Sequence, residues 1–144
     1  MVDLKGDSEN IKQFIIAGLE RFSKEVQKPV MIGIYCCPWS GWIMLNFNIS
    51  YRLNEESYYC LEFEFVEYEM LELKHWEEEY QTGEGIWTDD NLKVYRTNHD
   101  EGDEGLNKFF FNYLKELIAN LNEKHKLPST QLQFLDSNCR EKVI

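Results

Sequence analysis

The sequence has no long apolar run and no excess of positive charge. No apolar stretch reaches the roughly 18 residues that a membrane-spanning helix needs, so we expect no such helix. Residues 1–10 are polar and carry no apolar segment typical of a signal peptide, which predicts a cytoplasmic protein. The formal net charge of -11 argues against nucleic acid and anionic membranes as partners, because both are bound by clustered lysine and arginine.

Catalytic and metal-binding motifs are also missing. The chain contains no GxGxxG, Walker, GxSxG or HExxH pattern. Its three histidines do not share a spacing suited to chelation, and residues 98–105 lack the ligand order of an EF-hand. We therefore expect no metal ion, no cofactor and no enzymatic activity.

The four cysteines show no CxxC spacing, so we expect reduced thiols that pack as small apolar groups. Thiolate catalysis needs a histidine and positive surroundings. Cys36, Cys37 and Cys60 have apolar or acidic neighbours in the sequence, which would raise a thiol pKa and lower its reactivity.

What the chain does have is a composition that can build a core. Of its 144 residues, 43% are hydrophobic and 15% aromatic, which suits a single domain over residues 1–144. Apolar residues at helical spacing predict an amphipathic helix over residues 8–27, with Ser8 as its N-cap. A second, longer apolar stripe predicts a helix over residues 106–126.

Between the two helices the pattern changes to alternation. Residues 30–37 and 42–50 predict an antiparallel hairpin around a Pro-Trp-Ser-Gly turn. Residues 58–65 alternate again, and the phase slips near Val66. Either a bulge carries the strand on to about Leu73, which we favour, or a helix begins near Glu67. Residues 81–90 are turn-like, residues 91–97 suggest a short strand, and residues 131–135 suggest a last edge strand.

These elements predict an α+β fold. We expect an antiparallel sheet of about four to five strands, covered by the N-terminal helix and the long C-terminal helix.

The acidic residues are concentrated in one stretch. Residues 53–92 hold 13 of the 26 acidic residues and only one of the 15 basic residues, Lys74. If residues 58–73 form a strand, Glu62 and Glu64 project from the same face. Such a surface either keeps the protein soluble or docks a basic protein, which would relieve the repulsion among the carboxylates. The docking hypothesis uses these acidic residues and nearby aromatic anchors: Glu62, Glu64, Glu67, Glu69, Glu72, Trp76, Glu77, Glu78, Trp87, Asp89 and Asp90.

The layout also resembles a known group of proteins. The hairpin carries Ile-Gly-Ile-Tyr (residues 32–35) and Gly-Trp-Ile-Met-Leu-Asn-Phe (residues 41–47). The acidic middle carries His-Trp-Glu-Glu-Glu-Tyr (residues 75–80), and the chain ends with Phe-Leu-Asp-Ser (residues 134–137) after the long helix. With the N-terminal helix, this order resembles small bacterial domains encoded beside polymorphic or contact-dependent toxins.

The resemblance implies a cytosolic immunity protein. Such a protein binds a cognate toxin domain, often a basic nuclease, and blocks its active site; the group implies no catalytic residues. Two alternatives stay open. One is a regulatory or scaffolding module for another basic protein, and the other is an enzyme that acts on a small cationic substrate.

Overall fold

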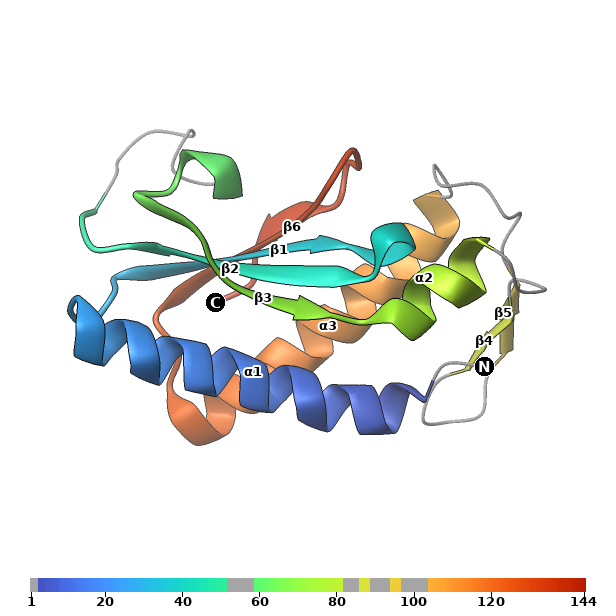
Figure 1. Cartoon of the computed structure of the whole chain (residues 1–144), viewed down its shortest axis with the longest axis horizontal. Coiled ribbons are helices and arrows are strands. Elements are labelled where there is room, and N and C mark those ends of the chain that lie inside the picture. The colour runs from blue at the N-terminus through green and yellow to red at the C-terminus, as the bar shows by residue number, and fades with distance from the viewer. Residues whose placement is uncertain (1–2, 52–58, 82–85, 89–93, 97–103) are drawn as a thin grey trace.

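The computed structural model describes residues 3–51, 59–81, 86–88, 94–96 and 104–144. Figure 1 shows two long helices on one side of a twisted sheet. In chain order the described elements are α1 (Leu4–Glu25), β1 (Met31–Cys37), the 3₁₀ turn η1 (Pro38–Ser40), β2 (Trp42–Asn48), the 3₁₀ turn η3 (Cys60–Glu62), β3 (Phe65–Glu72), α2 (Lys74–Gln81), β4 (Ile86–Thr88), β5 (Val94–Arg96), α3 (Glu104–His125), β6 (Ser129–Phe134) and β7 (Arg140–Lys142).

The main sheet has five strands in the order β3-β2-β1-β6-β7. The predicted α+β class is confirmed, and so is the hairpin of β1 and β2. The prediction of a purely antiparallel sheet is wrong, because β1 and β6 pair in parallel. The reason is that α1 leads into β1 and α3 leads into β6 from the same end of the sheet, so both strands run in the same direction (Figure 1).

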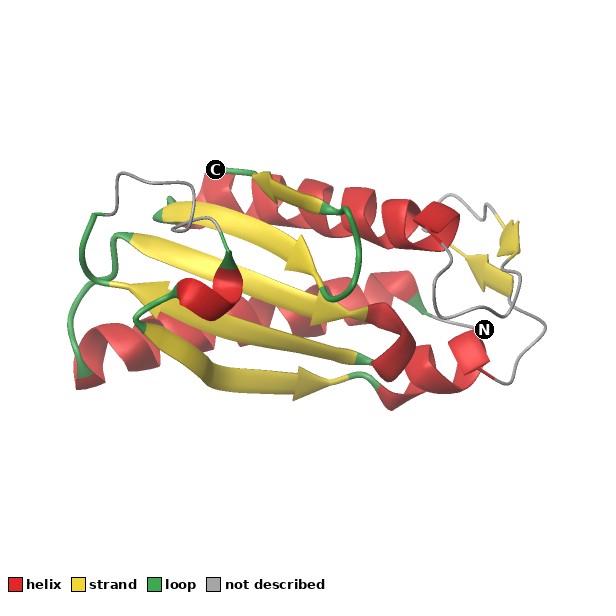
Figure 2. Ribbon diagram, turned by 90° about the horizontal axis from the view of Figure 1, so that it is seen from above, coloured by secondary structure: helices red, strands yellow, loops and turns green. Residues whose placement is uncertain are grey.

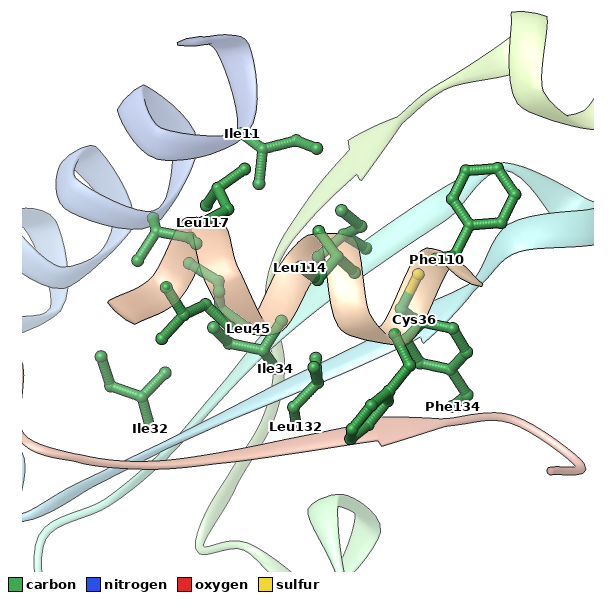
Figure 3. Close-up of a cluster of buried hydrophobic side chains, with 14 of the residues drawn as sticks. Ile11, Ile32, Ile34, Cys36, Leu45, Phe110, Leu114, Leu117, Leu132 and Phe134 are labelled. Atoms are coloured by element: carbon green, nitrogen blue, oxygen red, sulfur yellow. The ribbon is translucent and has the colours of Figure 1, made fainter. Parts of the chain in front are cut away.

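The core lies between the sheet and the two long helices. Figure 3 shows Ile11 of α1 and Leu114 and Leu117 of α3 facing Ile34 and Leu45 of the sheet. All five side chains are buried. Helix α3 lies close to its predicted range, whereas α1 begins a turn earlier than predicted. Its N-cap is Asp3, whose carboxylate accepts the Gly6 N–H, and Ser8 therefore lies inside the helix.

The segment after β2 departs most from prediction. Residues 58–65 were expected to form a strand, but Cys60–Glu62 is a 3₁₀ turn and β3 begins only at Phe65. The Cys60 N–H donates to Gln133 Oε1 at 2.8 Å, and a Cβ on Gly33 would meet the Phe63 ring at 2.9 Å. The segment therefore crosses the sheet instead of extending along its edge, because Gly33 leaves space for Phe63.

The phase slip near Val66 is the predicted bulge. Glu67 has a positive φ of 53°, and the β2–β3 register shifts opposite it. The strand continues to Glu72 and helix α2 begins at Lys74, so residues 67–80 contain both a strand and a helix.

Two further expectations are corrected near the ends of the sheet. Strand β6 is not an edge strand, because the unpredicted strand β7 pairs with its far side. The stretch 81–90, expected to be a turn, contains β4, which pairs with β5 in a separate two-stranded sheet. The expected strand at residues 91–97 is present as β5.

Candidate functional site

One face of the sheet lies away from α1 and α3, and we call it the outer face. Figure 2 shows it from above, with the strands in front of the long helices. Ile34 of β1 and Leu45 of β2 are buried and pair with each other, so they mark the inner face, which packs against the helices. Because side chains alternate along a strand, Tyr35, Met44 and Trp42, at odd spacings from these two residues, project from the outer face.

A small pocket opens on the outer face where β2 and β3 reach helix α2. We call it the Trp42 pocket; its volume is about 230 Å³ and it is lined by Ser40, Gly41, Trp42, Met44, Met70, Glu72, Lys74 and Glu77. The register places Trp42 opposite Glu72 and Met44 opposite Met70. Two adjacent strands thus supply its wall, and the turn into α2 closes one end.

Gly41 sets the shape of this closed end. It has a φ of 65°, and its carbonyl accepts the Leu73 N–H. A Cβ at this position would lie 2.3 Å from the Leu73 carbonyl oxygen, so another residue could not fit without moving the chain. The tight approach of Gly41 and Leu73 brings the start of α2, with Glu77, over the pocket.

The lining of the Trp42 pocket favours a cationic side chain. Trp42 presents an indole ring, which attracts cations to its face, and Tyr35 packs edge-on against it with ring centroids 5.4 Å apart. Met44 and Met70 add adaptable apolar surface. Two carboxylates, Glu72 and Glu77, outnumber the single ammonium of Lys74. The volume lies below the 300–1,000 Å³ range usual for small-molecule sites, which suits one protruding side chain better.

A second pocket lies farther along the outer face, beside η3. Its volume is about 390 Å³ and it is lined by Tyr59, Leu61, Glu62 and Gln133. The Arg140 guanidinium lies over the Tyr59 ring, 3.7 Å from the ring centroid. Tyr59 is 43% exposed and Leu61 is 55% exposed, so this end of the outer face presents apolar surface to the solvent.

The groove between α1 and α3 offers a contrasting surface. Its volume is about 540 Å³. It is lined by charges of both signs: Glu9, Glu20 and Lys124 are exposed, and Lys12 is half-buried. This balance does not select a basic over an acidic partner.

Several predicted docking residues do lie on or near the outer face. Glu62 is exposed on η3, and Glu67 and Glu72 are exposed on β3. Glu77 is half-buried in the wall of the Trp42 pocket, and Glu78 follows it as an exposed residue of α2.

Two predicted carboxylates have structural partners instead. Glu64 does not share a strand face with Glu62. Its Oε1 accepts the N–H groups of Ile49 at 3.0 Å and Ser50 at 2.9 Å, just past the end of β2. Glu69 lies toward α1 and forms an ion pair with Arg21. Because these charges already have protein partners, they are less available to a binding protein.

Trp76 was predicted as a surface anchor, but it belongs to the core. Its side chain is fully buried, and its ring lies 4.5 Å from the Phe110 ring. The indole Nε1–H donates to the buried carboxylate of Asp7 at 2.7 Å, and His75 Nε2 lies 2.8 Å from the same carboxylate. Trp76 lies in the first turn of α2, and its indole packs between that helix, Asp7 of α1 and Phe110 of α3.

The remaining predicted docking residues lie in the last part of the acidic stretch. The backbone of Trp87 belongs to β4. Asp89 and Asp90 lie outside the described residues.

The prediction from sequence did not include Trp42, Met44 or Met70 among the docking residues. The signal was present in the second strand of the hairpin, where Trp42 and Met44 share the face opposite the buried residues. Two large apolar side chains on the solvent-facing side of a half-buried strand indicate a binding surface.

The cysteines match their expected role as apolar packing groups. All four are buried and none forms a disulfide. Burial raises the pKa of the Cys36 and Cys60 thiols well above their ordinary value. Burial also raises the pKa of Cys139, and this outweighs an opposing hydrogen bond with Ser137. Thiols in such surroundings are poor nucleophiles at neutral pH.

In the described parts of the chain, no three His, Cys, Asp or Glu side chains converge as a metal site would require. No helix there is both long enough and apolar enough to cross a bilayer. No protein-family model, curated protein or solved structure matches this chain.

Proposed function

We propose that this protein binds a basic protein partner through the outer face of its sheet. In this proposal the Trp42 pocket receives a lysine or arginine side chain of the partner. The observation that carries it is the pocket lining itself, where Trp42, two methionines and two carboxylates against the one ammonium of Lys74 line a small cavity. The excess of acid in residues 53–92 would steer a basic partner toward this half of the molecule.

The partner that we favour is a toxin domain, which makes the protein an immunity protein. The layout of the chain supports this choice, and a basic toxin is a partner whose charge fits the outer face. The protein would then block the toxin by occupying its cationic substrate cleft. The proposal needs no catalytic group in this chain.

Charge reversal in the pocket tests the proposal. Glu72→Lys combined with Glu77→Lys changes the net charge by four units at the Trp42 pocket. Glu9→Lys combined with Glu20→Lys makes the same change in the groove between α1 and α3, and serves as the matched control. Glu64 is left unchanged because it holds two backbone N–H groups.

Each variant is used to capture proteins from the host lysate at low and high salt. We expect wild type and control to retain one basic protein, and the pocket variant to lose it. Retention should weaken as salt rises, because salt screens exposed charges. Equal loss in both variants would mean that overall charge matters and the pocket does not.

The toxin identity needs a second experiment. The captured protein is expressed in the host with and without this chain, and growth is measured. We expect wild type to restore growth, and Trp42→Ala to restore it less, because the alanine removes the indole face. A captured protein that does not inhibit growth would contradict the immunity function while leaving basic-partner binding in place.

A further inference from the structure

Strand β3 is an edge strand: among the described residues, no strand pairs with its edge on the side away from β2. The Leu73 N–H donates to the Gly41 carbonyl, which fixes that pair as a hydrogen-bonded one. Hydrogen-bonded and non-hydrogen-bonded pairs alternate along an antiparallel ladder. Leu71 and Glu69 therefore direct their backbone groups toward β2, and the N–H and C=O groups of Met70 and Glu72 point to the open edge.

Met70 and Glu72 also line the Trp42 pocket. The free backbone groups and the pocket are thus built from the same two residues. A strand added along this edge would place every second side chain on the outer face, next to the pocket. Its other side chains would lie beside Leu71, which packs against the core.

The open edge is short, and contacts on both sides fix its position. It spans residues 68–72, because the bulge at Glu67 interrupts the strand. The Glu67 N–H donates to Asn46 Oδ1 of β2 at 2.8 Å. On the helix side, the Tyr68 hydroxyl donates to Glu25, and Arg21 pairs with Glu69 and lies over the Tyr68 ring. A pre-ordered edge lowers the entropy cost of adding a strand.

Natural edge strands are commonly protected by charge and by bulges, and β3 has both. It also has features that protection does not require. Val66 is 44% exposed and Met70 is 49% exposed, so apolar side chains flank the carboxylates. The combination fits a partner strand that brings both positive charge and apolar side chains.

We propose that the partner adds a strand to the open edge of β3, with lysine or arginine at alternate positions on the outer face. This inference rests on the proposed function and states how the partner binds. A second copy of this chain is a poor occupant of the same edge. Pairing two β3 strands would gather six carboxylates, from Glu67, Glu69 and Glu72 of each copy, against two Arg21 side chains.

The test uses a synthetic peptide of alternating lysine and valine, acetylated and amidated, and the intact chain. A control peptide has the same sequence with every backbone nitrogen methylated, so it keeps its charge but cannot donate backbone hydrogen bonds. Binding is followed by NMR, together with hydrogen exchange of the amides of residues 68–72.

We expect the unmethylated peptide to slow exchange at Met70 and Glu72, while Glu69 and Leu71, already paired with β2, change little. Methylation should weaken binding by at least about tenfold, because several backbone hydrogen bonds are lost together. If both peptides bind equally well without the alternating protection, strand addition is wrong and basic-partner binding stands. If neither peptide nor any basic protein binds, both proposals fail. If the amides of Met70 and Glu72 are already protected in the free chain, and this protection increases with protein concentration, the chain pairs with itself and this inference is wrong.

Discussion

At the scale of single residues, the buried carboxylate of Asp7 links helix α1 to helix α2. It is 4% exposed and accepts the indole N–H of Trp76. We expect Asp7→Ala to lower the free energy of unfolding by about 1–3 kcal/mol, because the Trp76 N–H is then buried without an acceptor. Urea denaturation measures this loss.

Two variants control for other effects at Asp7. Asp7→Asn keeps an acceptor oxygen and should cost less than Asp7→Ala. Glu9→Ala removes an exposed charge two residues further along α1. It should change the free energy of unfolding by less than about 0.5 kcal/mol. Equal losses for alanine and asparagine would show that the Trp76 hydrogen bond is unimportant.

The cysteines give a second prediction at the residue scale. Burial raises the pKa of the Cys36, Cys60 and Cys139 thiols, so each has less reactive thiolate at pH 8 than an exposed cysteine. We expect a thiol reagent to modify the native protein slowly, and all four cysteines rapidly in denaturant. Rapid modification of Cys36 or Cys60 in the native protein would contradict their burial.

At the scale of elements, four side chains join α1 to β3. Arg21 and Glu25 of α1 contact Tyr68 and Glu69 of β3. The hydrogen bond from Tyr68, followed by the one from Arg21, lowers the pKa of Glu25. A carboxyl with a lowered pKa in the folded state stabilises the fold above its unfolded pKa. That contribution is lost as the pH falls through the folded pKa.

Tyr68→Phe tests this junction. It removes the hydroxyl and keeps a ring against Phe22 and Phe47. We expect the Glu25 pKa to rise toward its ordinary value, while Arg21 still holds it partly down; an NMR titration of the side-chain carboxyl measures the change. Tyr59→Phe, at the residue just before η3, should leave the Glu25 pKa unchanged. A Glu25 pKa that does not move in Tyr68→Phe would mean that the hydroxyl does not bond this carboxylate.

At the scale of the whole molecule, the net charge of -11 makes the folded protein repel itself. Raising the salt concentration from about 0.01 M to 0.15 M shortens the screening length from about 30 Å to about 8 Å. We therefore expect Tm to rise over this range, as measured by calorimetry. Replacing the exposed Glu62, Glu67 and Glu72 with glutamine should raise Tm at low salt and flatten its dependence on salt. A Tm that falls with added salt would show that attractive pairs outweigh the repulsion.

The sequence predicted those elements whose pattern is local. The apolar stripe of α3 and the alternation of β1 and β2 follow from the side chains that each element must bury, and both were found near their predicted positions. The slip near Val66 predicted the bulge, because an inserted residue reverses the alternation along one strand. The acidic stretch predicted a charged surface, and its residues Glu62, Glu67 and Glu72 are exposed.

The tertiary structure decided what depends on long-range contacts. The parallel pairing of β6 with β1 follows from where α3 returns the chain, and no local pattern encodes that position. Residues 60–62 have alternating character but form a turn, because Gly33 on a distant strand provides space for Phe63. Trp76 has a charged neighbourhood in sequence, yet Asp7 and Phe110 enclose it. The Trp42 pocket likewise exists only because the approach of Gly41 to Leu73 brings η1, β2, β3 and α2 together. Sequence fixes which side chains are available, whereas packing between distant segments determines which of them meet.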